Sequence, residues 1–169
     1  MVPHILVLLV CIGSDQLSKW LAVRYLVPAG PLSFFQDTLR LSYVENDGGF
    51  LGLLGGLPEN LRFLLLTCGV AGLVIPGLLW VLWSPTLCPA KALPALLVLG
   101  GGLSNLVDRL VNDGRVVDFL NIGLGGFRTG IFNLADLWIV CGSFALGAML
   151  FQRRAGDGQT PASGSGSCQ

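Results

Sequence analysis

The sequence predicts an all-α membrane protein with four transmembrane helices and a small extramembrane β element. Of its 169 residues, 53% are hydrophobic and only 12% are charged, about half the charged fraction of an ordinary soluble domain. The mean hydropathy is +0.72. Four stretches approach the ~20 apolar residues that a spanning helix needs. Two polar segments between them favour strands, one by its alternation and the other by its β-forming residues.

The composition also argues against several classes of function. Ten basic and ten acidic side chains leave no net charge, whereas a nucleic-acid partner requires a basic surface. One histidine and five cysteines without a CxxC pair give no support for zinc, a Ser-His-Asp triad or a Cys-His site. Glycine-rich stretches lack a Walker lysine. Neither a zinc site nor a phosphate-binding loop is therefore expected. Cys11, Cys68 and Cys141 lie in apolar runs, and we expect them to pack as small apolar residues.

The four predicted spans cover residues 3–25, 61–83, 92–103 and 132–151. A secretory signal peptide is the alternative for the first span. It is weakened because no lysine or arginine precedes the apolar run and no small-x-small cleavage site follows it. Residues 1–154 are expected to form the membrane domain, and residues 155–169 a flexible cytoplasmic tail.

The β element is expected in two connecting segments. Residues 39–46 (LRLSYVEN) alternate apolar and polar side chains, and residues 115–121 (RVVDFLN) are rich in β-formers before a glycine-rich turn at 123–126. An even number of spans places both segments on the same side of the membrane. Lys91, Arg153 and Arg154 suggest that the opposite side is cytoplasmic. A larger set of arginines near the β segments opposes this and leaves the orientation open: Arg24, Arg40, Arg62, Arg109, Arg115 and Arg128.

Ionisable residues in or beside the spans need an explanation, because a charge at a helix centre costs ~2.5–3.5 kcal/mol. Asp15 and Lys19 are four residues apart with the acid first, the favourable order for an ion pair. The pair either neutralises a helix end or supports a functional site. At the end of the third span, Asn105 can donate to a nearby carboxylate, Asp108 is interpreted as a structural acid beside Arg109, and Arg109 is expected to snorkel to the interface.

Asp118 and Asp136 are harder to explain as structure. Both lie in apolar surroundings without an adjacent base, and the connection of 17 residues between them can fold back to bring them together. Two close carboxylates cannot both ionise easily, so one retains a proton. Such a pair can activate water and polarise a carbonyl, as in aspartic peptidases. Two intramembrane acids are equally compatible with a proton relay or an ion path, and a non-enzymatic scaffold would tolerate their loss.

Short motifs in a fixed order resemble those of lipoprotein signal peptidase (signal peptidase II), a family of bacterial inner-membrane aspartic peptidases. The matching segments are DQLSK (15–19), VENDGGFLG (44–52), GGLSNLVDRL (101–110), GRVVDF (114–119) and FNLAD (132–136). Each motif alone is weak, but their order on this hydropathy pattern is specific. The chain departs from the usual pattern in a shorter NDGGF loop, in Ser104 at a position that is usually glycine, and in an extra residue at Asn112-Asp113.

The resemblance implies that Asp118 and Asp136 are the catalytic aspartates. It implies supporting roles for Asn46, Asn105, Asp108, Arg109 and Asn133, and a stabilising role for Asp15 and Lys19. The implied substrate is a prolipoprotein, cut on the amino side of its diacylglyceryl-modified cysteine without a metal or cofactor, with membrane lipids and no nucleic acid as further partners. The implied location is the bacterial inner membrane, with cytoplasmic termini, the β element on the periplasmic side and the site near the periplasmic face.

A lipid-bearing substrate fits this arrangement physically, since its acyl chains can stay in the bilayer while the scissile bond meets the interface. The strand-like segments are expected to hold the peptide extended. Phe34, Phe35, Phe50 and Leu51 either cover the site or serve as ordinary interfacial anchors.

Overall fold

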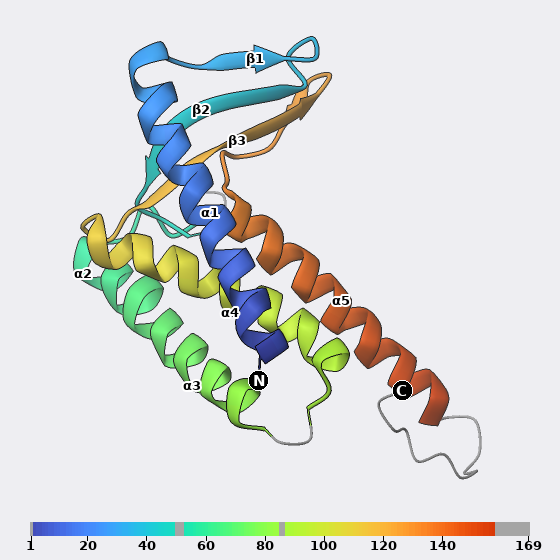
Figure 1. The fold of residues 1–169 in the computed structure, drawn as a ribbon. Coiled ribbons are helices and arrows are strands. Elements are labelled where there is room, and N and C mark those ends of the chain that lie inside the picture. Colours follow the sequence, from blue (N-terminus) through green and yellow to red (C-terminus); the bar gives the residue numbers. More distant parts are fainter. Residues whose placement is uncertain (1, 50–52, 85–86, 158–169) are drawn as a thin grey trace.

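The fold is a bundle of long helices that carries a small sheet at one end (Figure 1). The computed structural model describes residues 2–49, 53–84 and 87–157. Its helices are α1 (Val2–Ala29), α2 (Glu59–Arg62), α3 (Val70–Trp83), α4 (Pro89–Val111) and α5 (Leu134–Asp157), with a π-helical stretch, Phe63–Gly69, joining α2 to α3. Helix α1 begins and α5 ends at the end of the bundle that is remote from the sheet.

Within the described residues, four helices are long and apolar enough to cross a membrane: Val2–Ala29, Glu59–Trp83, Ala90–Val111 and Leu134–Gln152. The four predicted spans are therefore confirmed, and the third begins slightly earlier than the sequence suggests. Helix α5 runs three residues into the predicted tail, to Asp157. The rest of that predicted tail, residues 158–169, lies outside the described residues.

Helix α4 is the centre of the bundle, because half of its spanning window is buried while each of the other three spans is at most 28% buried. Its inner face joins a buried apolar cluster made of Leu8, Val74, Leu78, Val81, Ala92 and Leu96. Two glycines let α4 and α5 approach closely. A Cβ on Gly101 would lie 2.4 Å from the backbone oxygen of Ala135, and one on Gly142 would lie 2.6 Å from that of Pro94.

The sheet has four strands in the order β1-β2-β3-β4, with every neighbouring pair antiparallel. They are β1 (Leu32–Phe34), β2 (Leu39–Asn46), β3 (Val116–Leu124) and β4 (Phe127–Arg128). Strands β2 and β3 correspond to the two predicted segments, and the predicted glycine-rich turn connects β3 to β4. The short edge strand β1 has no counterpart among the predicted elements, because three residues are too few to show a periodic pattern.

The register of β2 against β3 determines what lies beside Asp118. An irregularity between Leu41 and Val44 shifts the pairing, so that Val44 lies opposite Asp118. On β3, Phe119 packs against Ala22 and Leu26 of α1. The sheet is thereby fixed to the end of α1, and the carboxylate of Asp118 is held where the sheet meets the helices.

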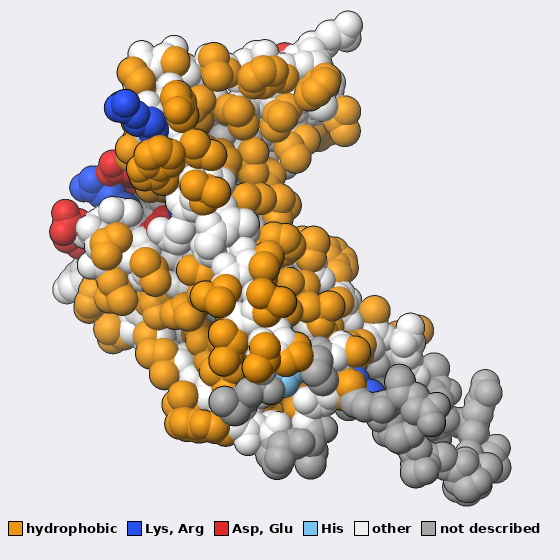
Figure 2. Space-filling model, in the orientation of Figure 1, with side chains coloured by type: hydrophobic (Ala, Val, Ile, Leu, Met, Phe, Trp, Pro, Cys, Tyr) orange, Lys and Arg blue, Asp and Glu red, His pale blue; other side chains and the backbone are white. Residues whose placement is uncertain are grey.

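Hydrophobic side chains cover much of the visible surface, while charged groups gather on one side between the sheet and the lower helices (Figure 2). This distribution fits helices that face lipid. Cys11 is buried as predicted, but Cys68 and Cys141 are exposed, so the packing prediction is wrong for these two. Apolar residues on the outside of a spanning helix face lipid rather than a core. Phe34 and Phe35 are exposed, and Phe50 and Leu51 lie outside the described residues.

Candidate functional site

Two buried aspartates face the junction between the sheet and the helices. Asp118 lies in the middle of the ladder between β2 and β3, and Asp136 lies in the first turn of α5. Both residues are almost fully buried, with relative exposures of 1% and 6%. The fold therefore brings together the two acids for which the sequence offers no structural explanation.

Asn133 connects the two aspartates. Its Nδ2 donates to Oδ1 of Asp118 at 2.7 Å. Its Oδ1 accepts from the backbone amide of Asp136 at 3.0 Å, while its own backbone amide donates to Oδ2 of Asp136 at 3.2 Å. This reciprocal pair is the capping arrangement that begins many helices. One asparagine thus starts α5, orients Asp136 and donates to Asp118.

Two more asparagines complete the hydrogen bonds of the aspartates. Asn46, at the end of β2, donates to Oδ2 of Asp118 at 2.8 Å and to the backbone oxygen of Gly49 at 3.0 Å. Asn105, on α4, donates to Oδ1 of Asp136 at 3.0 Å and accepts from Nδ2 of Asn133 at 3.1 Å. The predicted donation from Asn105 to a carboxylate is confirmed.

A buried lysine lies behind these asparagines. Nζ of Lys19 lies 2.7 Å from Oδ2 of Asp15 and 2.9 Å from Oδ2 of Asp108, and it donates to Oδ1 of Asn105 at 2.8 Å. The predicted ion pair between Asp15 and Lys19 is present. The structure extends it to a third charged residue on another helix and connects it to the site.

Each carboxylate of this ion cluster also holds the backbone directly before one of the two aspartates. Oδ1 of Asp15 accepts from the amide of Ala135 at 2.8 Å, one residue before Asp136. Oδ2 of Asp108 accepts from the amide of Val117 at 3.0 Å, one residue before Asp118. A single cation therefore links the two backbone segments that carry the site.

Arg109 differs from its sequence-based prediction. It is 8% exposed instead of snorkelling to the interface. Its Nη2 donates to the backbone oxygen of Gly48 at 2.8 Å, and its Nη1 lies 3.5 Å from that of Asn105. Asp108 pairs with Lys19 rather than with its neighbour Arg109. Arg109 points to the loop after β2 because that loop offers carbonyl oxygens that a buried guanidinium needs.

The surroundings of Asp118 favour its protonated form. Burial raises the pKa of Asp118 to about 6, against hydrogen bonds from Asn46 and Asn133 that lower it, and the nearby charge of Asp136 adds to the rise. A carboxyl group with such a pKa can either accept or donate a proton near neutral pH, which is the property that acid–base catalysis requires.

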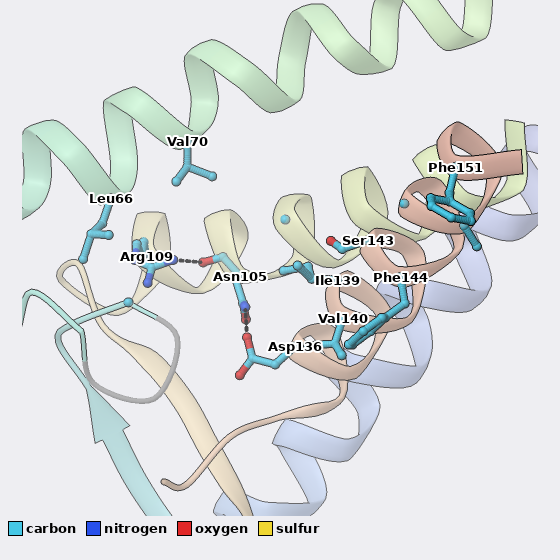
Figure 3. Close-up of a pocket in the computed structure, with 14 residues that line it drawn as sticks. Leu66, Val70, Asn105, Arg109, Asp136, Ile139, Val140, Ser143, Phe144 and Phe151 are labelled. Atoms are coloured by element: carbon cyan, nitrogen blue, oxygen red, sulfur yellow. Dashed lines mark hydrogen bonds between the residues drawn. The ribbon is translucent and has the colours of Figure 1, made fainter. Parts of the chain in front are cut away.

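A cavity of about 840 Å³ begins at these groups and continues along α5. Asn105, Arg109 and Asp136 lie at its polar end, and Ile139, Val140, Phe144 and Phe151 continue it along the helix (Figure 3). Its lining is mostly apolar. No group of three or more His, Cys, Asp or Glu side chains that could hold a metal ion occurs in the described part of the chain.

Comparison with known proteins identifies the family. A family model described as signal peptidase (SPase) II matches residues 7–152. The chain belongs to the signal peptidase II family. It is therefore a peptidase and a multi-pass bacterial membrane protein, and the resemblance found in its motifs is confirmed.

Individual relatives of the family agree with this assignment. The chain is 35% identical to a lipoprotein signal peptidase of Caldanaerobacter subterraneus, covering 80% of this chain and 87% of that protein. It is 33% identical to one of Moorella thermoacetica, covering 94% and 99%. Its fold is similar to that of a bacterial membrane enzyme solved by the in meso method, with a TM-score of 0.75, 19% identity, and 95% and 94% coverage.

The structure joins the predicted site residues in one hydrogen-bonded network, and it adds members that the sequence does not suggest. Gln16 and Ser104 contact the carboxylates of the ion cluster. The backbone amides of Val117 and Ala135 also contribute. Gln16 lies inside the DQLSK motif, which is the one available signal for it. A backbone amide has no sequence signal, because every residue except proline carries one.

Proposed function

We propose that this chain removes the signal peptide from bacterial prolipoproteins, cutting on the amino side of a diacylglyceryl-modified cysteine. Asp118 and Asp136 are the catalytic pair in this proposal. The observation that carries it is a pair of buried carboxylates bridged by Asn133, one of which, Asp136, lines the polar end of a mostly apolar cavity. Its relatives, which are lipoprotein signal peptidases, supply the substrate class.

The chemistry needs no group beyond the pair and water. The ionised aspartate takes a proton from a water molecule, whose oxygen attacks the scissile carbonyl carbon. The protonated aspartate donates to the carbonyl oxygen and stabilises the negative charge that develops there. When the tetrahedral intermediate breaks down, a proton passes to the leaving amine of the cysteine, and the pair returns to its shared-proton state. Asp118 and Asp136 titrate as a unit in this scheme.

The remaining network residues act on the pair rather than on the substrate bond. Asn46 and Asn133 donate to the two oxygens of Asp118, which leaves its orientation little freedom. Asn105 does the same for Asp136. Arg109 holds the loop after β2 against the site through Gly48. Asp15, Lys19 and Asp108 fix the backbone on which the pair is mounted.

The cavity suits a substrate that is partly lipid. Ile139, Val140, Phe144 and Phe151 offer an apolar wall along α5, against which a signal peptide or an acyl chain can pack without leaving the bilayer. The polar end lies beside the sheet, where the peptide bond meets the membrane interface. Helix α1 begins and α5 ends at the opposite end of the bundle from the sheet. With the termini in the cytoplasm, as the family resemblance implies, the site lies near the periplasmic face.

The decisive experiment is cleavage of a diacylglyceryl-modified prolipoprotein by purified enzyme in detergent. Asp118→Asn and Asp136→Asn are each expected to reduce cleavage by at least about 10³-fold, because an amide can neither accept nor supply the shared proton. Asp37→Asn is the matched control, since Asp37 lies in the sheet region and its side chain is 43% exposed. Substantial cleavage by either dyad variant would remove the catalytic role of that residue.

A further inference from the structure

A second bridge connects Asp15 and Asp108 beside Lys19. Oγ of Ser104 donates to Oδ2 of Asp15 at 2.7 Å. Nε2 of Gln16 donates to Oδ1 of Asp108 at 2.7 Å and to Oγ of Ser104 at 3.1 Å. Ser104 is fully buried. The two amide hydrogens of Gln16 and the hydroxyl hydrogen of Ser104 all have acceptors in this arrangement, so no donor of the bridge lacks a hydrogen-bond partner.

The bridge gives the two carboxylates matching surroundings. Asp15 accepts from Lys19, Ser104 and the amide of Ala135. Asp108 accepts from Lys19, Gln16 and the amide of Val117. Two buried anions share one cation, so neutral donors must stabilise the remaining negative charge. Ser104 stabilises it at Asp15, and Gln16 stabilises it at Asp108.

We propose that Ser104 and Gln16 are positioning residues for the hydrolytic reaction. They keep Lys19 shared between Asp15 and Asp108 and within reach of the aspartate pair. This inference rests on the proposed function, because its effect is felt at the pair. Neither residue touches the substrate or the reacting atoms in this role, and both act through the carboxylates that hold the segments before Asp118 and Asp136.

Loss of the Ser104 hydroxyl should make the aspartate pair harder to ionise. Asp15 then has one donor fewer and draws Lys19 towards itself, away from Asn105 and the pair. The charge of Lys19 stabilises the ionised form of Asp118, so the pair becomes harder to ionise. The charged groups of the surrounding elements are Asp15 and Lys19 on α1, Asp108 and Arg109 on α4, Asp118 on β3, and Asp136 on α5. Of these, the hydroxyl contacts Asp15, and it acts on Lys19 through Asp15.

The test is the pH dependence of cleavage by the full chain in detergent, with a synthetic diacylglyceryl prolipoprotein peptide as substrate. Ser104→Ala is expected to move the acid limb of kcat/KM upward by about 0.5 pH unit. It should lower kcat below about pH 6 by roughly threefold and leave KM within about twofold. Ser18→Ala is the matched control, because Ser18 lies on α1 and donates to the backbone oxygen of Asp15 rather than to its carboxylate. An acid limb that stays in place for folded Ser104→Ala overturns the inference.

A double-mutant cycle with Gln16→Met tests the bridge itself. The two substitutions should be non-additive in kcat, since either one opens the same chain of hydrogen bonds. Additive effects would contradict a shared bridge. If Ser104→Ala does not fold, Ser104→Gly supplies the same loss of the hydroxyl. Failure of the wild-type enzyme to cleave would reject the proposed function, whereas cleavage with an unshifted Ser104 variant would reject only this inference.

Discussion

The carboxylate of Asp15 accepts a hydrogen bond from the backbone amide of Ala135 at 2.8 Å, across 120 positions of the chain. Ala135 directly precedes Asp136, so a residue on the first helix anchors the first turn of the last helix. Asp108 makes the corresponding contact to Val117, directly before Asp118. The geometry of the aspartate pair therefore depends on the ion cluster of Asp15, Lys19 and Asp108.

Removing the cation of that cluster should damage stability and activity together. In Lys19→Met, two buried carboxylates lose their shared counter-ion, which typically costs about 3–5 kcal/mol for one broken buried pair. Thermal unfolding in detergent should show a large loss of stability, and cleavage should fall well beyond the loss of folded protein. Lys91→Met is the control, because Lys91 is exposed near the start of α4. Equal behaviour of the two variants would argue against the role assigned to Lys19.

Substitutions of Asn133 can separate its capping of α5 from its hydrogen bond to Asp118. Asn133→Ser keeps a helix-capping oxygen for α5, so stability should change by less than about 1 kcal/mol. A serine side chain is too short to keep the 2.7 Å contact to Asp118, and kcat should fall by about 10-fold to 100-fold through loss of that oriented donor. Asn133→Ala should lose both the helix cap and the hydrogen bond to Asp118, so stability and kcat should both fall. A serine variant with wild-type kcat would mean that the bridge to Asp118 does not contribute to the reaction.

The sequence predicts the spans and the longer strands well, because those features depend on periodicity and hydropathy. Four apolar stretches, one alternating segment and one segment rich in β-formers form the expected elements. The aspartate pair is also accessible to prediction, because an acid in an apolar stretch is costly and needs a reason. The resemblance to a family then places Asn46 and Asn133, whose motifs are specific only in combination.

The remaining site features depend on three-dimensional contacts. The sequence predicts Arg109 at the interface because arginines at helix ends commonly snorkel, yet the loop after β2 returns and supplies Gly48 as an acceptor. The sequence indicates only a structural acid at Asp108 and does not reveal its partner Lys19, which lies on another helix. Ser104 and Gln16 are small or common polar residues, and only their mutual distances reveal a bridge.

The pH dependence of stability should report the buried state of Asp118. Its pKa is raised to about 6 in the folded protein, above its ordinary 3.8, so the protonated form is favoured by folding. Protonation of Asp118 therefore contributes about 3 kcal/mol to the free energy of unfolding. This contribution is fully present below the ordinary pKa and is lost as the pH rises through about 6. An asparagine side chain does not titrate, so the melting temperature of Asp118→Asn minus that of wild type should increase by roughly 5 °C between about pH 4.5 and about pH 7.5.

Asp37→Asn is a suitable control for that series. Hydrogen bonds from Arg40 and Ser33 lower the pKa of the solvated Asp37 to about 2, so Asp37 is ionised throughout the tested range. The melting temperature of its variant relative to wild type should not depend on pH. A flat difference for Asp118→Asn as well would show that the Asp118 carboxyl does not change its protonation state across this range in the folded protein.

The contact between α4 and α5 offers a steric test of the site. A Cβ on Gly101 would lie 2.4 Å from the backbone oxygen of Ala135 and 2.9 Å from a side-chain carbon of Ile139. Because a backbone atom cannot rotate away, Gly101→Ala should push the first turn of α5 outward and cost about 1–3 kcal/mol. That movement carries Asp136 away from Asn105, so cleavage should drop further than the loss of stability explains.

Gly72→Ala provides the matched comparison for this steric effect. Gly72 lies on α3, and a Cβ added there would extend into open space, while alanine is the better helix former by about 1 kcal/mol. This variant should retain full cleavage and at least wild-type stability in the same detergent assay. If Gly101→Ala behaved like Gly72→Ala in both measurements, the close approach of the two helices would not be what holds Asp136 in place, and the hydrogen bonds from Asn105 and Asn133 together with the ion cluster would have to account for its position.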